Sequence, residues 1–130
     1  RQVVFDLFNK ISKNPKELVL TSKVGDSRDM SFVEDMSRAI VFLNENLVPN
    51  GDIINIGSGK ETQIIDIAKI VSKVLNYSGE IKYADISNSY DGTSWVADIS
   101  KLKKINFNYN YDIESGLIKT IKSWKVYEKD

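Results

Sequence analysis

The sequence contains no cysteine and no histidine among its 130 residues. Without cysteine it can form no disulfide, has no thiol nucleophile and cannot hold a cysteine-ligated zinc ion. Without histidine it lacks the side chain that most often serves as a general base or a metal ligand. Lack of cysteine is compatible with a reducing compartment, so we expect a cytoplasmic protein.

Charge and hydropathy argue against two classes of partner. Basic and acidic residues each number 18, so there is no net basic charge to attract nucleic acid. The chain has no run of about 18 apolar residues, the length that a membrane-spanning helix needs. We therefore expect neither a nucleic-acid partner nor a membrane partner. The hydrophobic fraction, 42%, is typical of a folded globular chain.

The length suits one domain, residues 1–130, either complete or as part of a larger protein. The first residues, RQVVFDLFNK, include Asp6 and lack a small-residue cleavage site, which argues against a signal peptide. Because Arg1 is not a usual first residue, we expect the chain to have been part of a longer one.

Helical and extended segments alternate along the chain. Apolar residues at helical spacing predict helices over 3–11, 32–47, 64–75 and 113–124. Short apolar segments predict strands over 18–22, 52–59 and 80–84, the second running into a glycine turn. Alternating aromatics over 107–111 are typical of a half-buried strand. This pattern predicts an α/β or α+β class.

Several polar residues are predicted to mark the starts of helices. We expect Thr62 to cap the helix over 64–75 and Asp98 to cap a short helix that ends near residue 104. Asp112 or Ser115 is expected to begin the last helix. The segment between residues 85 and 93 is polar and is predicted to be a loop.

Arg28, in VGDSRDMSFVED (24–35), is the first candidate site residue. An arginine just before a helix N-terminus can complete an anion site, and its planar guanidinium suits phosphate. Local sequence alone favours a solvated arginine that pairs with Asp29 or Asp35. The acids around it do not have the spacing of a calcium loop, so we predict no metal site.

Two further motifs each favour a turn when taken alone. GSGKET (57–62) has neither the Walker spacing nor the third glycine of a dinucleotide fingerprint, so it is predicted to be a turn that needs positive φ. Asp91, in the Asp-Gly-Thr of 91–93, would accept hydrogen bonds from sugar or base donors if it had a function.

Three blocks together resemble the extended short-chain dehydrogenase/reductase family, the NAD(P)-dependent nucleotide-sugar epimerases and dehydratases. SRDMSFVEDMSRAIVFLNENL (27–47) is similar to its R-D/E-F-x-x-V-x-D segment. DIINIGSGKETQIIDIAKIVSKVL (52–75) resembles its N-I-G-S-G strand–turn–helix, and 97–124 is similar to its usual ending. YSGEI and YDGTSWVADISKLKK most resemble the GDP-fucose synthase branch, although Ser94-Trp95 stand where that branch has a basic pair.

The resemblance implies a role for each candidate residue. Arg28 would contact the nucleotide diphosphate, Asp91 the nucleotide or sugar, and Lys10 the substrate. Gln2 falls near a substrate-facing histidine of fucose synthases. Asp29 and Asp35 would aim the arginine, with Asp35 also capping its helix. Gly57 and Gly59 would shape the turn.

The family's catalytic groups have no counterpart in this sequence. None of its six tyrosines has a lysine four residues later, and the glycine-rich dinucleotide turn is missing. The resemblance therefore implies a C-terminal substrate-binding part that is inactive by itself and holds no catalytic residue. NAD or NADP would bind an N-terminal Rossmann half. A homodimer is left open. The alternative is a non-catalytic nucleotide-sugar-binding or assembly module, whose terminal helices would pack on a partner.

Overall fold

The computed structural model describes residues 2–48, 50–84 and 94–127, which form five helices and four short strands. In chain order the elements are α1 (Val3–Ser12), β1 (Glu17–Leu20), β2 (Ser27–Asp29), α2 (Val33–Asn46), β3 (Glu61–Gln63), α3 (Ile64–Leu75), β4 (Glu80–Tyr83), α4 (Ser100–Lys104) and α5 (Ile113–Tyr127). Within these residues, no helix has the length and apolar content needed to cross a membrane. The structure therefore has the mixed helix-and-strand composition that the sequence predicts.

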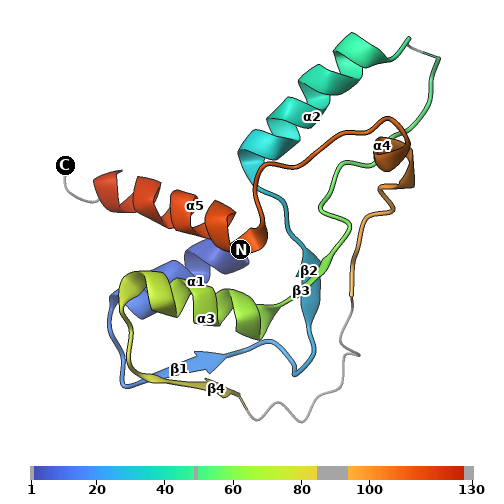
Figure 1. Cartoon of the computed structure of the whole chain (residues 1–130). Coiled ribbons are helices and arrows are strands. Elements are labelled where there is room, and N and C mark those ends of the chain that lie inside the picture. Colours follow the sequence, from blue (N-terminus) through green and yellow to red (C-terminus); the bar gives the residue numbers. More distant parts are fainter. Residues whose placement is uncertain (1, 49, 85–93, 128–130) are drawn as a thin grey trace.

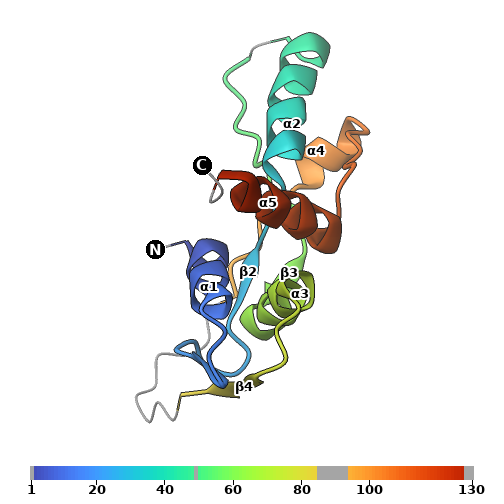
Figure 2. The same cartoon turned by 90° about the vertical axis from the view of Figure 1, so that its left-hand side faces the viewer.

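The strands form two separate two-stranded sheets. β1 and β4 pair in parallel, with Glu17 opposite Glu80 and Leu20 opposite Tyr83. β2 and β3 pair antiparallel, with Arg28 opposite Thr62. Figures 1 and 2 place the β1–β4 sheet at one end of the molecule and α2 with α4 at the other, and the β2–β3 ladder lies between them.

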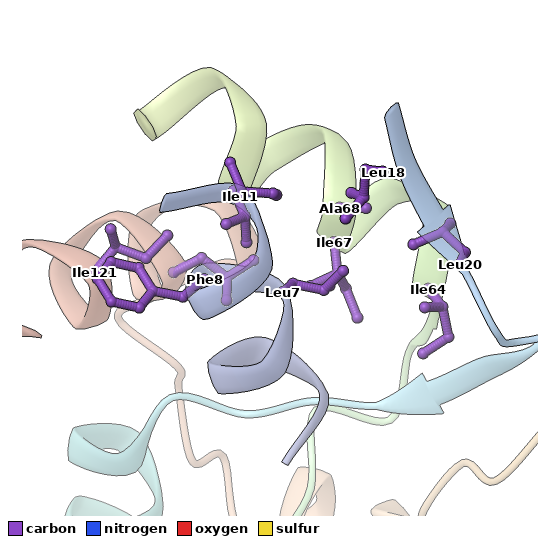
Figure 3. Packing of buried hydrophobic residues seen from close by; sticks show 11 residues of the cluster. Leu7, Phe8, Ile11, Leu18, Leu20, Ile64, Ile67, Ala68 and Ile121 are labelled. Carbon is purple, nitrogen blue, oxygen red and sulfur yellow. The ribbon is translucent and has the colours of Figure 1, made fainter. Parts of the chain in front are cut away.

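The larger hydrophobic core lies where α3 packs against both α1 and α5, with β1 beside them (Figure 3). Its buried side chains come from helical spacing on three helices and from alternate positions of β1. They are Leu7, Phe8, Ile11, Leu18, Leu20, Ile64, Ile67, Ala68, Val71, Leu117 and Ile121. Full burial of a large apolar side chain contributes roughly 1.5–3 kcal/mol, so this core supplies most of the hydrophobic stabilisation.

The terminal helices use their apolar faces inside this core. Leu7 and Phe8 of α1 and Ile121 of α5 are almost fully buried, and Phe8 packs edge-on against Trp124. The expectation that these two faces remain available for a partner was therefore wrong. They cover each other and α3 instead.

A smaller core lies at the α2 end of the molecule. Ala39, Ile99, Leu102 and Phe107 are buried there, and Phe42, Leu43, Ile54 and Ile56 pack against them. Phe107 belongs to an irregular segment, so the predicted strand over 107–111 does not form. The alternating aromatics nevertheless predicted core packing correctly for Phe107, which is buried in this core.

Two local expectations need correction, and one pair of strands was not predicted. The segment 52–59 forms no strand in the described structure, whereas the unpredicted β2 and β3 pair with each other. Thr62 lies inside β3 and does not cap α3, whose N-cap position is Gln63. A strand needs a partner as well as an apolar sequence, and periodicity cannot supply the partner.

The start of α5 agrees with expectation, whereas the N-cap position of α4 is Ile99 and not Asp98. Asp98 lies just before α4 and its carboxylate accepts the N–H of Ser100 at 2.9 Å. Asp112 directly precedes α5 and accepts the N–H of Ser115 at 2.8 Å, while the Ser115 hydroxyl accepts the N–H of Asp112 at 3.1 Å. This reciprocal pair satisfies backbone donors that a helix N-terminus leaves without partners.

Candidate functional site

Asp29 fastens the glycine turn to the β2–β3 ladder. One carboxylate oxygen accepts the N–H of Ser58 at 2.7 Å and its hydroxyl at 2.6 Å. The other oxygen accepts the N–H of Gly59 at 2.9 Å and that of Ala97 at 3.0 Å. Four hydrogen bonds accepted by one carboxylate therefore hold two segments that are 29 and 68 residues away in the sequence.

The charge of Asp29 is stabilised by these donors. Burial alone raises the pKa of the Asp29 carboxyl, but the hydrogen bonds from Ser58, Ala97 and Gly59 outweigh it. The pKa is therefore lowered from its ordinary value, because the donors favour the ionised form. Asp29 is a structural anion that fixes the position of the turn.

The two glycines of the turn are required for different reasons. A Cβ on Gly57 would lie 2.7 Å from the Cβ of Ala97 and 2.9 Å from an oxygen of Asp29, so a side chain has no room. Gly59 adopts φ +64°, in the left-handed region that disfavours other residues. The predicted positive-φ turn is confirmed at Gly59, while Gly57 is needed for the close approach of its neighbours.

Asp35 fastens a second loop. It is buried in the first turn of α2, where its carboxylate accepts the N–H groups of Asn110 and Tyr111 and pairs with Arg38 at 2.5 Å. Burial alone raises the pKa of Asp35, but these donors and the Arg38 charge lower it overall. The expectation that Asp35 caps its own helix was wrong, because its oxygens are used by a loop 75 residues later.

Tyr109 joins this loop to the glycine turn. Its hydroxyl donates a short hydrogen bond to the carbonyl of Gly57, and its ring packs edge-on against Phe107. Burial raises the pKa of Tyr109, and the nearby Asp29 charge raises it further. The phenol therefore stays protonated and acts as a hydrogen-bond donor.

A cavity of about 680 Å³ lies beside these two fastened loops. Its wall combines aromatic rings with a few polar groups, which come from the start of α1, the β2–α2 junction, the β3 segment and α5. They include Gln2, Phe32, Lys60, Tyr111, Thr120 and Trp124. A cavity of this size, mostly apolar with a few polar groups, is typical of a small-molecule site.

Glu34, at the edge of the cavity, is held by contacts with Lys119 and Tyr111. Lys119 pairs with Glu34 at 2.6 Å, and the hydroxyl of Tyr111 donates to Glu34 at 2.8 Å. Hydrogen bonds from Lys119 and Tyr111 lower the pKa of Glu34. The exposed pair of Glu34 and Lys119 orders the rim of the cavity, and the lowered pKa keeps Glu34 ionised.

No protein-family model matches the sequence, but related proteins do. A GDP-L-fucose synthase from Sinorhizobium fredii is 35% identical over 99 residues, which make up 75% of this chain and 31% of that protein. The structure of a UDP-N-acetylglucosamine 4-epimerase from Methanobrevibacter ruminantium M1, in complex with UDP-N-acetylmuramic acid, superposes with a TM-score of 0.77 at 28% identity. That match covers 98% of this chain and 40% of the epimerase chain. The chain matches the C-terminal portion of an extended short-chain dehydrogenase/reductase.

A third comparison extends the likeness of fold. The GDP-mannoheptose C4 reductase from Campylobacter jejuni, solved with NADP bound, matches with a TM-score of 0.80 and covers 96% of this chain and 45% of that chain. Its 17% identity makes this a statement about fold alone. The chain spans about a third of the length of the curated relatives that it matches. The expected family and fold class are thus confirmed.

The structure places the four residues for which the resemblance implies substrate contacts in different surroundings. Gln2 lines the cavity. Arg28 does not: it lies half-buried in β2, where its guanidinium donates to the carbonyl of Ser27 at 2.5 Å. Lys10 pairs with Asp6 across one turn of α1 at 3.0 Å. Asp91 lies outside the described residues, so it stays a prediction.

Sequence reasoning missed Lys60, Tyr109 and Tyr111, which line the same cavity as Gln2. In the GSGKET motif, Lys60 would have been a candidate phosphate ligand only if the motif had the Walker spacing, which it lacks. The alternation of the aromatics pointed to core packing, which holds for Phe107 but not for Tyr111. Over the described ranges, 2–48, 50–84 and 94–127, no cluster of three acidic side chains is arranged to hold a metal ion.

Proposed function

We propose that this chain is the nucleotide-sugar-binding part of an NAD(P)-dependent nucleoside-diphosphate-sugar epimerase, dehydratase or reductase of sugar and polysaccharide biosynthesis. The observation that carries the proposal is the match over 98% of the chain, at 28% identity, to an epimerase solved with a nucleotide sugar. In this proposal residues 1–130 form one substrate-binding domain of a longer cytoplasmic protein.

Arg28 is proposed to bind the diphosphate. It sits on the β2–β3 ladder, and its neighbour Asp29 is held by four hydrogen bonds, so the backbone that carries the guanidinium is firmly placed. A planar guanidinium can donate two parallel hydrogen bonds to phosphate oxygens.

Asp91 is proposed to contact the sugar or the base, and Lys10 and Gln2 to contact the substrate. Gln2 is the best supported of these three, because it lines the 680 Å³ cavity together with aromatic side chains. Its amide both donates and accepts hydrogen bonds, as sugar hydroxyls require. Lys10 could serve only by leaving Asp6, an exposed pair of the kind that contributes little to stability.

The chemistry is assigned to the portion that precedes this chain. NAD or NADP would bind there, next to a Tyr-x-x-x-Lys pair in which the lysine lowers the pKa of the tyrosine for proton transfer. The chain itself contains no such pair, no histidine and no cysteine. By itself it is proposed to bind nucleotide sugars weakly, without cofactor and without turnover.

Titration calorimetry of the full-length protein with GDP- and UDP-sugars tests this assignment. One charge-assisted phosphate contact is worth about 1.5–3 kcal/mol, so Arg28→Ala should weaken binding by roughly tenfold to more than a hundredfold. Lys69→Ala, on the exposed side of α3, is the matched control and should bind normally. Unchanged affinity in Arg28→Ala would remove Arg28 from the site.

The alternative is a binding or assembly module that kept the fold without the catalytic half. The upstream coding sequence discriminates between the two. A glycine-rich turn and a Tyr-x-x-x-Lys pair in the same reading frame support the enzyme, and their absence supports the module.

A further inference from the structure

The strand that carries Arg28 is too short to hold its position by itself. β2 contains three residues, and its ladder with β3 has three residue pairs. Strands usually contain about 3–10 residues, and an isolated pair of strands is marginally stable at best. The position of Arg28, in the middle of β2, therefore depends on the contacts that hold the ends of this strand.

Asp29 holds the C-terminal end of β2 through both its main chain and its side chain. Its N–H donates to the carbonyl of Trp95 at 2.8 Å. Its carboxylate accepts the N–H groups of Ser58 and Gly59 at 2.7 and 2.9 Å. The glycine turn and β2 are therefore tied together, and Arg28 directly precedes the residue that joins them.

Gly57 packs directly against the Asp29 carboxylate. A Cβ at Gly57 would lie 2.9 Å from an oxygen of Asp29 and 2.7 Å from the Cβ of Ala97, so the main chain here is in close contact with both residues. Close-packed groups transmit a displacement to their neighbours. A shift of Gly57 would therefore move the side chain of Asp29.

Tyr109 links Gly57 to the smaller core. Its hydroxyl donates a hydrogen bond to the carbonyl of Gly57. Its ring packs edge-on against Phe107, with 5.1 Å between the ring centroids, and Phe107 is buried in the smaller core. A phenylalanine at position 109 could make the same ring contact, so the hydroxyl is the group that ties the turn to this core.

The main chain that follows Tyr109 is fixed as well. The N–H groups of Asn110 and Tyr111 donate to the buried carboxylate of Asp35 at 3.0 and 2.9 Å. That carboxylate also pairs with Arg38 on the same helix. Tyr109 is therefore a firmly held connection between the first turn of α2 and the glycine turn.

We propose that Tyr109 is a positioning residue of the nucleotide-sugar site: its hydroxyl fixes the glycine turn, the turn fixes Asp29, and Asp29 places the guanidinium of Arg28 for the diphosphate. This inference rests on the proposed function, and it adds a residue that acts on the ligand only through Arg28. Productive contacts depend on accurate placement, so a small shift of β2 should weaken the phosphate contact without abolishing it.

A double-mutant cycle in the full-length protein tests this inference, with GDP and UDP as the probes and titration calorimetry as the measurement. We expect Tyr109→Phe to weaken nucleotide binding by about threefold to tenfold, less than Arg28→Ala, because the arginine is displaced and not removed. The double variant should bind no more weakly than Arg28→Ala, because two residues that act through one contact are not additive. Tyr77→Phe is the matched control: it loses a hydroxyl that donates to the carbonyl of Glu80 at 3.4 Å, and it should bind normally.

The cycle separates this inference from the proposed function. Parental affinity in Tyr109→Phe would overturn the positioning role. Effects that multiply in the double variant would also overturn it, since Tyr109 would then contact the ligand directly from the cavity wall. Normal binding by Arg28→Ala would refute the proposed role of Arg28 and the positioning role with it.

Hydrogen exchange measured by NMR checks the structural link without any ligand. In Tyr109→Phe the amides of Ser58 and Gly59 should exchange faster than in the parent protein, whereas the amides of β1 should be unchanged. Unchanged exchange at Ser58 and Gly59 would overturn the proposal. Faster exchange throughout the protein would overturn it too, because the hydroxyl would then stabilise the fold as a whole and not the turn.

Discussion

Replacing Asp29 by asparagine is the sharpest test of how the glycine turn is held. Asparagine keeps one carbonyl oxygen, which can still accept from Ser58, but its amide would face the N–H groups of Gly59 and Ala97. Two part-buried donors lose their acceptor, at about 1–3 kcal/mol each. We therefore expect Asp29→Asn to lower the free energy of unfolding by about 2–6 kcal/mol. Asp66→Asn removes an exposed pair with Lys69 and should cost less than about 1 kcal/mol.

Urea unfolding at several pH values measures both the size and the origin of this effect. The folded-state pKa of Asp29 lies below its ordinary value, so its ionised form stabilises the protein above the unfolded-state pKa. That contribution is lost as the pH falls below about 4, through the lowered folded-state pKa. Asp29→Asn should remove this part of the acid destabilisation. An unfolding free energy within about 0.5 kcal/mol of the parent at neutral pH would refute the reasoning.

Two further substitutions test the same region by urea unfolding. Gly57→Ala should cost about 1–3 kcal/mol because its Cβ would meet Ala97 at 2.7 Å, and a neutral result would mean that the turn relaxes easily. Gly25→Ala is the matched control: it has φ +88° and nothing within 4 Å, so only backbone strain of about 1 kcal/mol is expected. Tyr109→Phe should lose about 0.5–1.5 kcal/mol with its hydrogen bond to Gly57, and no loss would show that water replaces the phenol.

The helices of the larger core were predictable because each has a one-sided apolar face. Leu7, Phe8 and Ile11 recur at helical spacing, and the structure buries all three. The β2–β3 ladder was not predictable, since its strands are three residues long and carry polar side chains such as Arg28 and Thr62. Such short strands form because a neighbour is present, and single-sequence patterns do not identify the neighbour.

The roles of the acids show where local reasoning stops. Asp29 and Asp35 lie close to Arg28 in the sequence, which favoured an interaction with it. The structure instead directs Asp29 to Ser58, Gly59 and Ala97, and Asp35 to Asn110 and Tyr111. A carboxylate satisfies backbone donors wherever the fold brings them, and separations of 29 to 76 residues are not visible in a local motif.

The composition of the larger core has a consequence for how the protein folds during synthesis. Its first member, Leu7, and its last, Ile121, are separated by nearly the whole chain. Parallel pairing of β1 with β4 likewise joins Glu17 to Glu80. Contacts of such high sequence separation slow folding, and a nascent chain cannot complete them before α5 has left the ribosome. The apolar face of α1 is therefore incompletely covered until α5 has been synthesised, and chains truncated before α5 would leave it accessible to chaperones and proteases.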